Sequence, residues 1–157
     1  MKDFFGIHYK GNAFHAFSYA HLTTIFVIVF LSFMIYQFRE RLREDRINQW
    51  MRYAMGVALL IQQSLLYLWY HVNGLWSFAV SLPLNLCEAA VLLCIVLLFT
   101  GSKRIYEVLY FWSIGVLSAI ITPDLNGYNP SHFMFYHFFI THGLVVIAVL
   151  FMTFVNG

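Results

Sequence analysis

The sequence predicts an all-α fold, a polytopic bundle of about five transmembrane helices formed by residues 1–157 as a single domain. Two observations lead to this prediction. Hydrophobic residues make up 61% of the chain and charged residues only 10%, whereas a soluble domain carries about 25% charged residues. The apolar residues also gather into long runs, and a helix that crosses the bilayer needs roughly 20 mostly apolar residues.

Five stretches are long and apolar enough to be spans. They cover residues 16–38, 51–70, 81–99, 106–122 and 133–155. Runs of this length are not strands, because a membrane barrel would show alternating segments of about ten residues. The first run is long enough to remain as a span, and the N-terminus lacks a short apolar region followed by a small-residue cleavage site.

The loops between the spans predict an orientation. Seven of the nine basic residues lie in or beside two loops, as Arg39, Arg41, Arg43, Arg46, Arg52, Lys103 and Arg104. Such loops stay in the cytoplasm, so we expect a cell-membrane protein with its N-terminus outside. The net charge of +2 is too small to indicate a nucleic-acid partner. The last span ends at FMTFVNG without a basic anchor, so we expect that the C-terminal part of a longer protein is missing.

The cysteines and histidines predict neither a disulfide nor a metal site. Cys87 and Cys94 are seven residues apart, which places them roughly 10 Å apart along one helix, too far for a disulfide. Six groups with metal-binding chemistry are His71, His132, His137, His142, Glu88 and Asp124. They form no HExxH motif, and the chain has no phosphate-binding loop or dinucleotide fingerprint. We therefore expect no metal and no cofactor.

Polar side chains within the spans indicate a functional site, because such groups are costly in a membrane. They are Gln62, Gln63, Asn85, Cys87, Glu88 and His142, with Asp124 at the rim. If spans three and five enter from outside, Cys87 lies roughly 9 Å and His142 roughly 13 Å along their helices. Gln63 reaches a similar depth in span two. We therefore predict one polar layer in the outer half of the membrane.

Each of these residues also has a structural interpretation. A cysteine often packs as a small hydrophobe, and His142 precedes Gly143, where close helix packing favours a hydrogen bond between helices. Glu88 would then be a buried, paired carboxyl group, and Pro83 an ordinary helix kink. His137 lies about 140° around the helix from His142, so we expect His137 to have a separate role at the rim, as for His132.

Three motifs, LPLNLCEA, TPDL and HFFITHG, occur in this order and resemble the transmembrane protein 164 family, which includes bacterial YwaF-like integral membrane proteins. The resemblance implies acyl transfer on phospholipids by a membrane-embedded Cys and His, in a fold similar to that of the androgen-induced gene 1 lipid hydrolases. The matching positions are Cys87 and His142. Family members often have His where this chain has Asn85, and they usually have further spans after the fifth.

The chemistry of such a pair agrees with the predicted layer. A free thiol has a pKa of about 8.5 and is mostly neutral at pH 7, so Cys87 would need His142 as a base. Donors to the oxyanion would be Asn85, Gln62 or Gln63, and Glu88 or Asp124 would orient the histidine. The partners expected are membrane lipids, with a phospholipid or lysolipid as substrate, and a second copy of the chain.

Two other functions remain open from the sequence. The chain would be a non-enzymatic protein that binds lipid or a small molecule, or a subunit of a larger assembly, which its 17 Phe and 10 Tyr would suit. A transporter is the third interpretation, but the chain has no visible inverted repeat. Retention of the phenotype in Cys87→Ser together with its loss in Glu88→Leu or Gln63→Leu would favour the binding protein.

Overall fold

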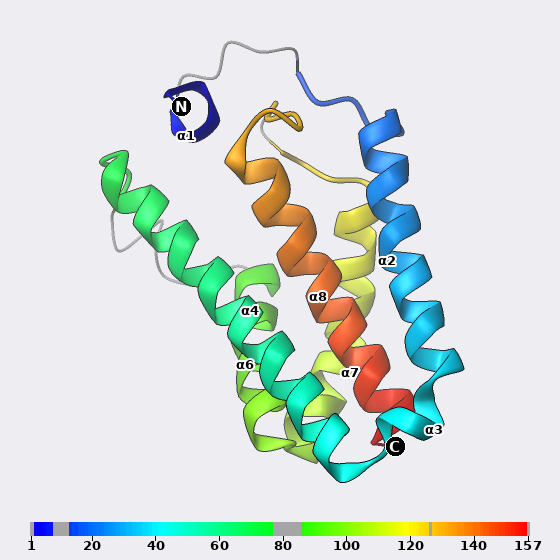
Figure 1. Ribbon diagram of the computed structural model, residues 1–157. Helices are drawn as coiled ribbons and strands as arrows, with labels where there is room; N and C mark the ends of the chain where they lie inside the picture. Colours follow the sequence, from blue (N-terminus) through cyan, green and yellow to red (C-terminus); the bar gives the residue numbers. More distant parts are fainter. Residues whose placement is uncertain (1, 8–12, 77–85, 126, 157) are drawn as a thin grey trace.

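The computed structural model describes the chain except for residues 1, 8–12, 77–85, 126 and 157. The regular elements in the described part are helices: α1 (Lys2–Phe5), α2 (Tyr19–Gln37), α3 (Arg39–Leu42), α4 (Asp45–Val72), α6 (Leu86–Thr100), α7 (Lys103–Ile121) and α8 (Phe133–Val155). Figure 1 shows the long helices side by side in an elongated bundle, with the two chain ends at opposite ends of it. The predicted all-α fold is confirmed.

Several of these helices suit a membrane. Among the described residues, α2, α7 and α8 are long and apolar enough to cross a bilayer, and α6 is a shorter apolar helix. The chain is therefore a multi-pass membrane protein. Helix α4 has 28 residues but begins in the polar sequence DRINQ, so its apolar part is only one portion of its length. The count of five spans and their orientation stay predictions.

The observed helix bounds follow the predicted spans closely. Helix α8 begins and ends where the fifth span was expected, and α2 and α7 differ from theirs by at most three residues. Helix α4 begins six residues before the predicted span, at Asp45, because a helix does not need apolar residues where it projects beyond the membrane. The start of the third span, with the Pro83 kink and Asn85, lies outside the described residues.

Helix α8 is the centre of the bundle and contacts α2, α4, α6 and α7. In its most apolar stretch 61% of the residues are buried, compared with 17% in α2 and in α7. A helix that is apolar on all sides packs in the interior of a bundle, and α8 has that character. The outer helices leave large apolar side chains exposed, as a surface in contact with lipid requires.

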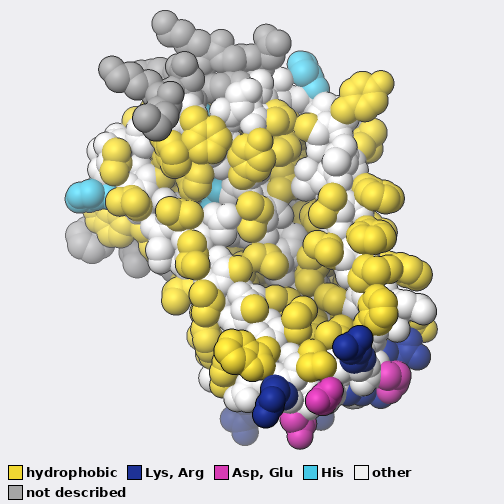
Figure 2. Space-filling view, in the orientation of Figure 1, with side chains coloured by type: hydrophobic (Ala, Val, Ile, Leu, Met, Phe, Trp, Pro, Cys, Tyr) yellow, Lys and Arg dark blue, Asp and Glu magenta, His cyan; other side chains and the backbone are white. Residues whose placement is uncertain are grey.

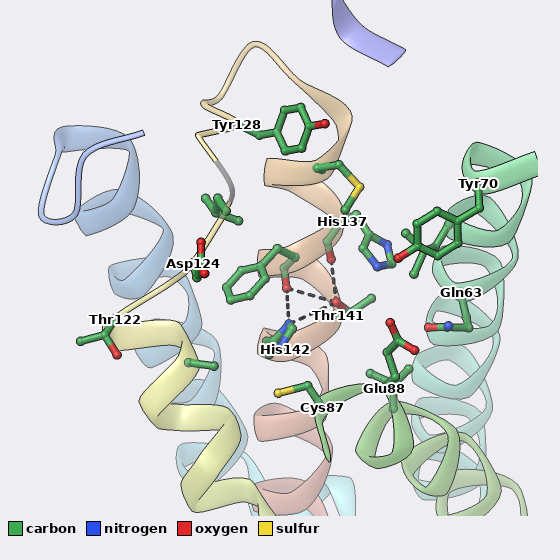
Figure 3. Close-up of a pocket in the computed structure, with 16 residues that line it drawn as sticks. Gln63, Tyr70, Cys87, Glu88, Thr122, Asp124, Tyr128, His137, Thr141 and His142 are labelled. Atoms are coloured by element: carbon green, nitrogen blue, oxygen red, sulfur yellow. Dashed lines mark hydrogen bonds between the residues drawn. The ribbon is translucent and has the colours of Figure 1, made fainter. Parts of the chain in front are cut away.

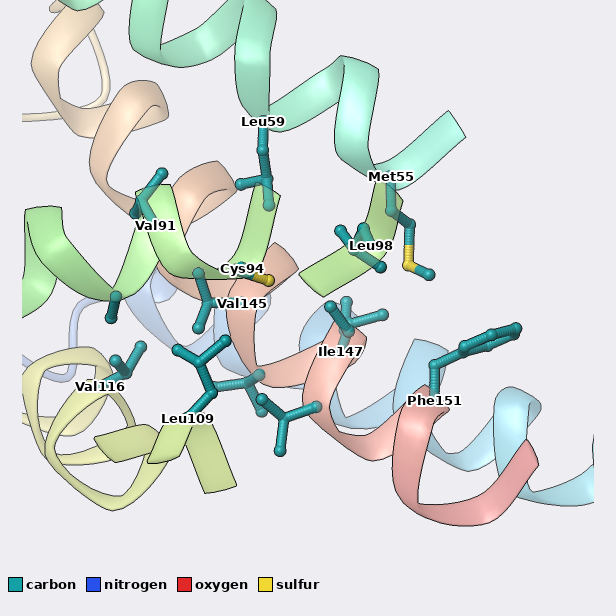
Figure 4. Packing of buried hydrophobic residues seen from close by; sticks show 14 of the residues in the cluster. Met55, Leu59, Val91, Cys94, Leu98, Leu109, Val116, Val145, Ile147 and Phe151 are labelled. Carbon is teal, nitrogen blue, oxygen red and sulfur yellow. The ribbon is translucent and has the colours of Figure 1, made fainter. Parts of the chain in front are cut away.

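Buried apolar side chains fill the half of the bundle nearer the C-terminus, and we call this cluster the dry core. Figure 4 shows Leu59, Cys94, Leu98 and Phe151 among its side chains, from three different helices. Cys94 and Phe151 have no exposed surface at all. Because lipid tails are as apolar as these side chains, tight packing rather than water exclusion holds such helices together.

Charged side chains gather at the same end of the molecule, near the turns that join α2, α3 and α4 (Figure 2). Arg43 donates to the carbonyl of Phe154 at 3.2 Å, and Arg52 Nε donates to that of Leu98 at 3.0 Å. These carbonyls lie at the ends of α8 and α6, where the last turn of a helix has no partners of its own and favours cations. The arginines therefore cap two neighbouring helices.

The opposite end carries an N-terminal strap, which we define as residues 2–7. Its carbonyls at residues 5–7 accept hydrogen bonds from Trp69 (2.8 Å), Asn73 (3.1 Å), His132 (3.0 Å) and Tyr128 (3.4 Å). These donors come from α4 and from the segment before α8. The strap thus ties two distant parts of the chain together, an arrangement that the sequence analysis did not predict.

Candidate functional site

A pocket of about 390 Å³ lies between α4, α6, α7 and α8 on the strap side of the dry core. Figure 3 shows polar side chains from three of these helices and from the α7–α8 connection around it. Its polar lining includes Gln63, Cys87, Glu88, Asp124, His137 and His142. Several polar groups of the predicted layer therefore meet in one cavity.

The structure brings together most of the residues predicted for the site. Five of them line the pocket: Cys87, His142, Glu88, Gln63 and Asp124. Gln62 is not among the residues that line it, although its Oε1 is buried and has no hydrogen-bond partner in the described part of the chain. Asn85 lies outside the described residues, so its predicted part in the layer stays a prediction.

His142 is held in one orientation by its own helix. Its Nδ1 lies 2.8 Å from the carbonyl oxygen of Phe138, and its ring stacks on that of Phe138 with the centroids 4.1 Å apart. A carbonyl only accepts, so Nδ1 carries the proton and donates it to this hydrogen bond. In the neutral ring Nε2 then has the free lone pair. His142 therefore has the tautomer that a general base needs.

Cys87 lies in the first turn of α6 and lines the pocket together with His142. Its thiol is free and partly exposed, whereas Cys94, two turns further along, is fully buried. Figure 3 shows the Cys87 sulfur and the His142 ring in the same part of the cavity, reached from two different helices. A nucleophile and a base on separate helices can in this way act on one bound molecule.

Glu88 follows Cys87 and belongs to a second polar group within the pocket. It interacts electrostatically with both Cys87 and Tyr70. In Figure 3 its carboxylate points toward the amide of Gln63, which comes from α4. Gln63 is only 3% exposed, and its Nε2 has no hydrogen-bond partner among the residues that the structure describes. The Glu88 carboxylate therefore lies near Gln63 without accepting from its Nε2, and this nitrogen is a buried donor with no partner among the described residues.

His137 lies in the pocket and not at the rim, so the expectation from the helical wheel was wrong. It is 7% exposed, lines the same cavity as His142 and interacts electrostatically with it. Its ring also contacts the backbone of Gln62. The wheel angle misled because the cavity extends around α8, so that residues on different faces of the helix reach it.

Asp124 comes from the connection between α7 and α8, in the TPDL motif. It lines the pocket together with Thr122 and Leu125. Asp124 and Glu88 are the residues of formal charge in the described lining, and both are acidic. The cavity therefore offers carboxylates and neutral polar groups to a ligand, and its described lining contains no lysine or arginine.

The comparison with family models decides the relationship of the chain. The model of the TMEM164 family matches residues 16–157. The chain belongs to the TMEM164 family. Neither a curated protein nor a solved structure matches the chain. The matched range contains α2 to α8 and all residues that line the pocket, so the family relationship covers the bundle and the candidate site alike.

Two further residues of this TMEM164 family protein belong to the site although they were not predicted for it. They are Tyr70, on α4, and Thr141, which precedes His142 in the HFFITHG motif; both line the pocket. Thr141 Oγ1 donates to the carbonyl of His137 at 2.7 Å and lies 3.4 Å from His142 Nδ1. Only the position of Thr141 beside His142 gave a signal in the sequence.

His132 of the TMEM164 family protein is a structural residue at the start of α8. Its Nδ1 accepts from the Met134 backbone N–H at 3.1 Å, so Nε2 carries the proton that it donates to Gly6. Burial lowers the pKa of His132, against an opposing effect of the hydrogen bond to Gly6. In the described residues of the chain, no group of three or more His, Cys, Asp or Glu is arranged to hold a metal ion.

Proposed function

We propose that the protein is a membrane acyltransferase that moves a fatty acyl chain from a phospholipid to a lysolipid or to water through a thioester on Cys87. One observation supports this most directly. The free thiol of Cys87 and the imidazole of His142 line one pocket from two different helices, and His142 has its Nε2 lone pair available. Membership of the TMEM164 family and the resemblance of its Cys and His motifs agree with the proposal.

The first half of the reaction forms the thioester. His142 Nε2 takes the thiol proton, and the sulfur attacks the ester carbonyl carbon of the phospholipid. The carbon–oxygen bond to glycerol breaks, and the departing oxygen receives the proton from His142, which releases a lysolipid. Covalent catalysis of this kind divides one difficult transfer into two easier steps.

The second half regenerates the enzyme. His142 Nε2 takes the proton of the acceptor hydroxyl, whose oxygen attacks the thioester carbonyl carbon. The carbon–sulfur bond breaks, and the sulfur recovers a proton from His142. A lysolipid acceptor gives a new phospholipid, and water gives a free fatty acid, so transfer and hydrolysis compete for the same thioester.

The proposal includes five spans in the cell membrane, with α4 as the second, and the N-terminus outside. The described arginine and lysine side chains gather at the end of the bundle away from the pocket (Figure 2), and basic loops favour the cytoplasmic side. The pocket would then lie in the outer half of the bilayer. Ester groups of lipids lie between the headgroups and the hydrocarbon, near the depth expected for Cys87.

Turnover by the purified protein tests the proposal. The full chain in lipid nanodiscs receives a phospholipid with a labelled acyl chain and an unlabelled lysolipid, and product formation is compared between wild type, Cys87→Ala and the matched variant Cys94→Ala. We expect product from wild type and Cys94→Ala and none from Cys87→Ala, with the acyl group detected on Cys87 by intact mass. Equal turnover in wild type and Cys87→Ala would end the proposal.

Binding of lipid without reaction is the second candidate function. The observation that favours it is the pair of buried polar atoms without partners in the described chain, Gln63 Nε2 and His137 Nδ1, which a bound polar group would satisfy with no chemistry. In the same assay, retention of labelled lipid by both wild type and Cys87→Ala without product would support this candidate.

A further inference from the structure

Two polar atoms of the pocket stand out because they are buried and unpaired. Gln63 Nε2 and His137 Nδ1 have no hydrogen-bond partner among the described residues, and their side chains are only 3% and 7% exposed. An unsatisfied buried polar group costs roughly 1–3 kcal/mol, so such groups are rare unless something binds them. Both residues line the pocket of about 390 Å³.

The two atoms come from facing helices and differ in what they offer. Gln63 on α4 supplies an amide N–H, which needs an acceptor, whereas an imidazole nitrogen of His137 on α8 can accept or donate. A hydroxyl group meets both needs at once, because its oxygen accepts from Gln63 while its O–H pairs with His137. A ligand group that only donates would leave Gln63 Nε2 without an acceptor.

The charge of the pocket selects a neutral group over an anion. Its charged residues in the described lining are the carboxylates Glu88 and Asp124. A phosphate placed beside Gln63 and His137 would share the pocket with these two acidic side chains, and the described lining has no Lys or Arg to bind it. An uncharged hydroxyl meets no such repulsion.

The pocket is also larger than ordered water requires. A water molecule occupies about 30 Å³ in the liquid, so a cavity of about 390 Å³ has room for the glycerol part of a lipid. His137 and His142 line the same cavity from one helix and interact electrostatically. A hydroxyl held at His137 would therefore lie on the same side of the bundle as the His142–Cys87 pair.

We infer that Gln63 and His137 form a hydroxyl-binding subsite that holds the free hydroxyl of a single-chain glycerolipid, the acyl acceptor. This inference rests on the proposed function for its catalytic meaning, but the binding itself does not depend on any reaction. In the transfer step the held oxygen attacks the thioester carbon as described above. Its proton goes to His142 Nε2 and then to the departing sulfur. Gln63 and His137 bind and orient the acceptor.

Binding is tested first, in the Cys87→Ala background, where no acyl transfer can occur. The ligands are 1-palmitoyl lysophosphatidylcholine and its 2-O-methyl ether, in which the hydroxyl is capped, and binding to the full chain in nanodiscs is measured by competition with a labelled lysolipid. We expect the free hydroxyl to strengthen binding about tenfold, equal to about 1.4 kcal/mol. This preference should disappear in His137→Phe and in Gln63→Met.

Matched variants keep the result interpretable. Gln49→Met changes an exposed glutamine of the same helix, whose amide donates to Tyr53 at 3.1 Å, and it should keep the full preference. The thermal melting temperature of each variant reports whether the bundle is intact. His137→Asn restores a hydrogen-bonding group near the position of Nδ1 and should recover part of the preference in a protein where His137→Phe has lost it.

The transfer reaction gives a second, separate measurement. In the Cys87 protein, the ratio of new phospholipid to free fatty acid should fall about tenfold in His137→Phe and in Gln63→Met, because the acceptor hydroxyl is no longer held while water still reaches the thioester. Equal binding of the lysolipid and its methyl ether by wild type would overturn the inference, whatever the turnover. Absence of acyl-Cys87 together with an intact hydroxyl preference would instead reject the proposed function and leave the subsite in place.

Discussion

Two cysteines on one helix separate the two halves of this molecule. Cys87 and Cys94 both belong to α6, two turns apart, but Cys87 faces a polar pocket beside Glu88 whereas Cys94 is fully buried in the dry core. Helix α8 passes through both halves and changes character at Gly143. Before this residue it lines the pocket with His137 and His142, and after it the buried residues are almost all apolar.

The comparison teaches that neighbouring helices, and not the residue type, decide the role of a side chain here. Around Cys94, the facing helices supply Leu59, Leu109 and Val145, which offer only packing. Around Cys87, α4 supplies an amide group, α8 supplies imidazole groups, and the α7–α8 connection supplies a carboxyl group. A substitution in one half should therefore change activity with little effect on stability, and in the other half the reverse.

The largest expected effect is on activity, from His142→Asn. Asparagine can still donate to the Phe138 carbonyl, which His142 contacts at 2.8 Å, but it cannot take a proton from a thiol. We expect acyl transfer to fall by about 10²–10⁴-fold, measured as initial rates with labelled phospholipid, while the melting temperature changes little. Rates within a factor of three of wild type would show that His142 is not the base.

The next effect is on stability, from Leu97→Ala in the dry half. Leu97 has no exposed surface and belongs to the core cluster, so its truncation leaves a cavity that costs about 2 kcal/mol or more. Unfolding in mild detergent, followed by circular dichroism, should show this loss. The specific activity of the folded fraction should stay near that of wild type, and a matching loss of activity would break the division into two halves.

A smaller effect is expected at the boundary, from Gly143→Ala. A Cβ at this position would lie 3.0 Å from Ile28 Cδ1, so α2 and α8 would have to move apart or Ile28 would have to change rotamer, at a cost of about 1 kcal/mol. Ile28→Val removes the offending methyl group, and the double variant should recover part of the loss. Strict additivity of the two substitutions would contradict the close approach.

The smallest effect is a dependence on pH at the strap. Burial lowers the pKa of His132 in the folded protein, so below about pH 6.5, the value of an unperturbed histidine, the unfolded chain binds a proton that the folded chain does not. The stabilisation is therefore complete above this pH and is lost as the pH falls. The protection factors for hydrogen exchange at residues 5–7, corrected for the intrinsic exchange rate at each pH, should be lower at pH 5.5 than at pH 7.5, and His132→Gln should abolish the difference.

The sequence predicted the helices well, because length and apolar character are strong local signals. The bounds of α8 were predicted from the length of its apolar run. The polar layer on α4, α6 and α8 was predicted from the number of residues between each polar side chain and the end of its span. Its predictions were weaker wherever several helices act together. His137 was assigned to the rim because its angle on a single helix was compared with that of His142, while the width of a cavity among four helices is not written in any one of them.

The role of His132 and the N-terminal strap were missed for a similar reason. Trp69, Asn73 and His132 bind backbone carbonyls, and every residue type has a carbonyl, so no sequence pattern marks the acceptors. Of the three donors, only His132 was named in the sequence analysis, and it was placed at the rim. The depth of each polar side chain along its helix can be predicted by counting residues in the sequence. Its hydrogen-bond partner can be identified only once the helices are placed together in the bundle.

The strap has a consequence for mutational tolerance. At Gly6 and Ile7 the hydrogen bonds from the bundle reach main-chain oxygens, from His132 at 3.0 Å and Tyr128 at 3.4 Å, so a wide range of side chains at positions 6 and 7 should preserve these bonds. The constraint falls on the donors, since replacing His132 leaves the carbonyl of Gly6 without its partner. In a saturation library, most substitutions at positions 6 and 7 should therefore be tolerated, whereas most substitutions at His132 should not.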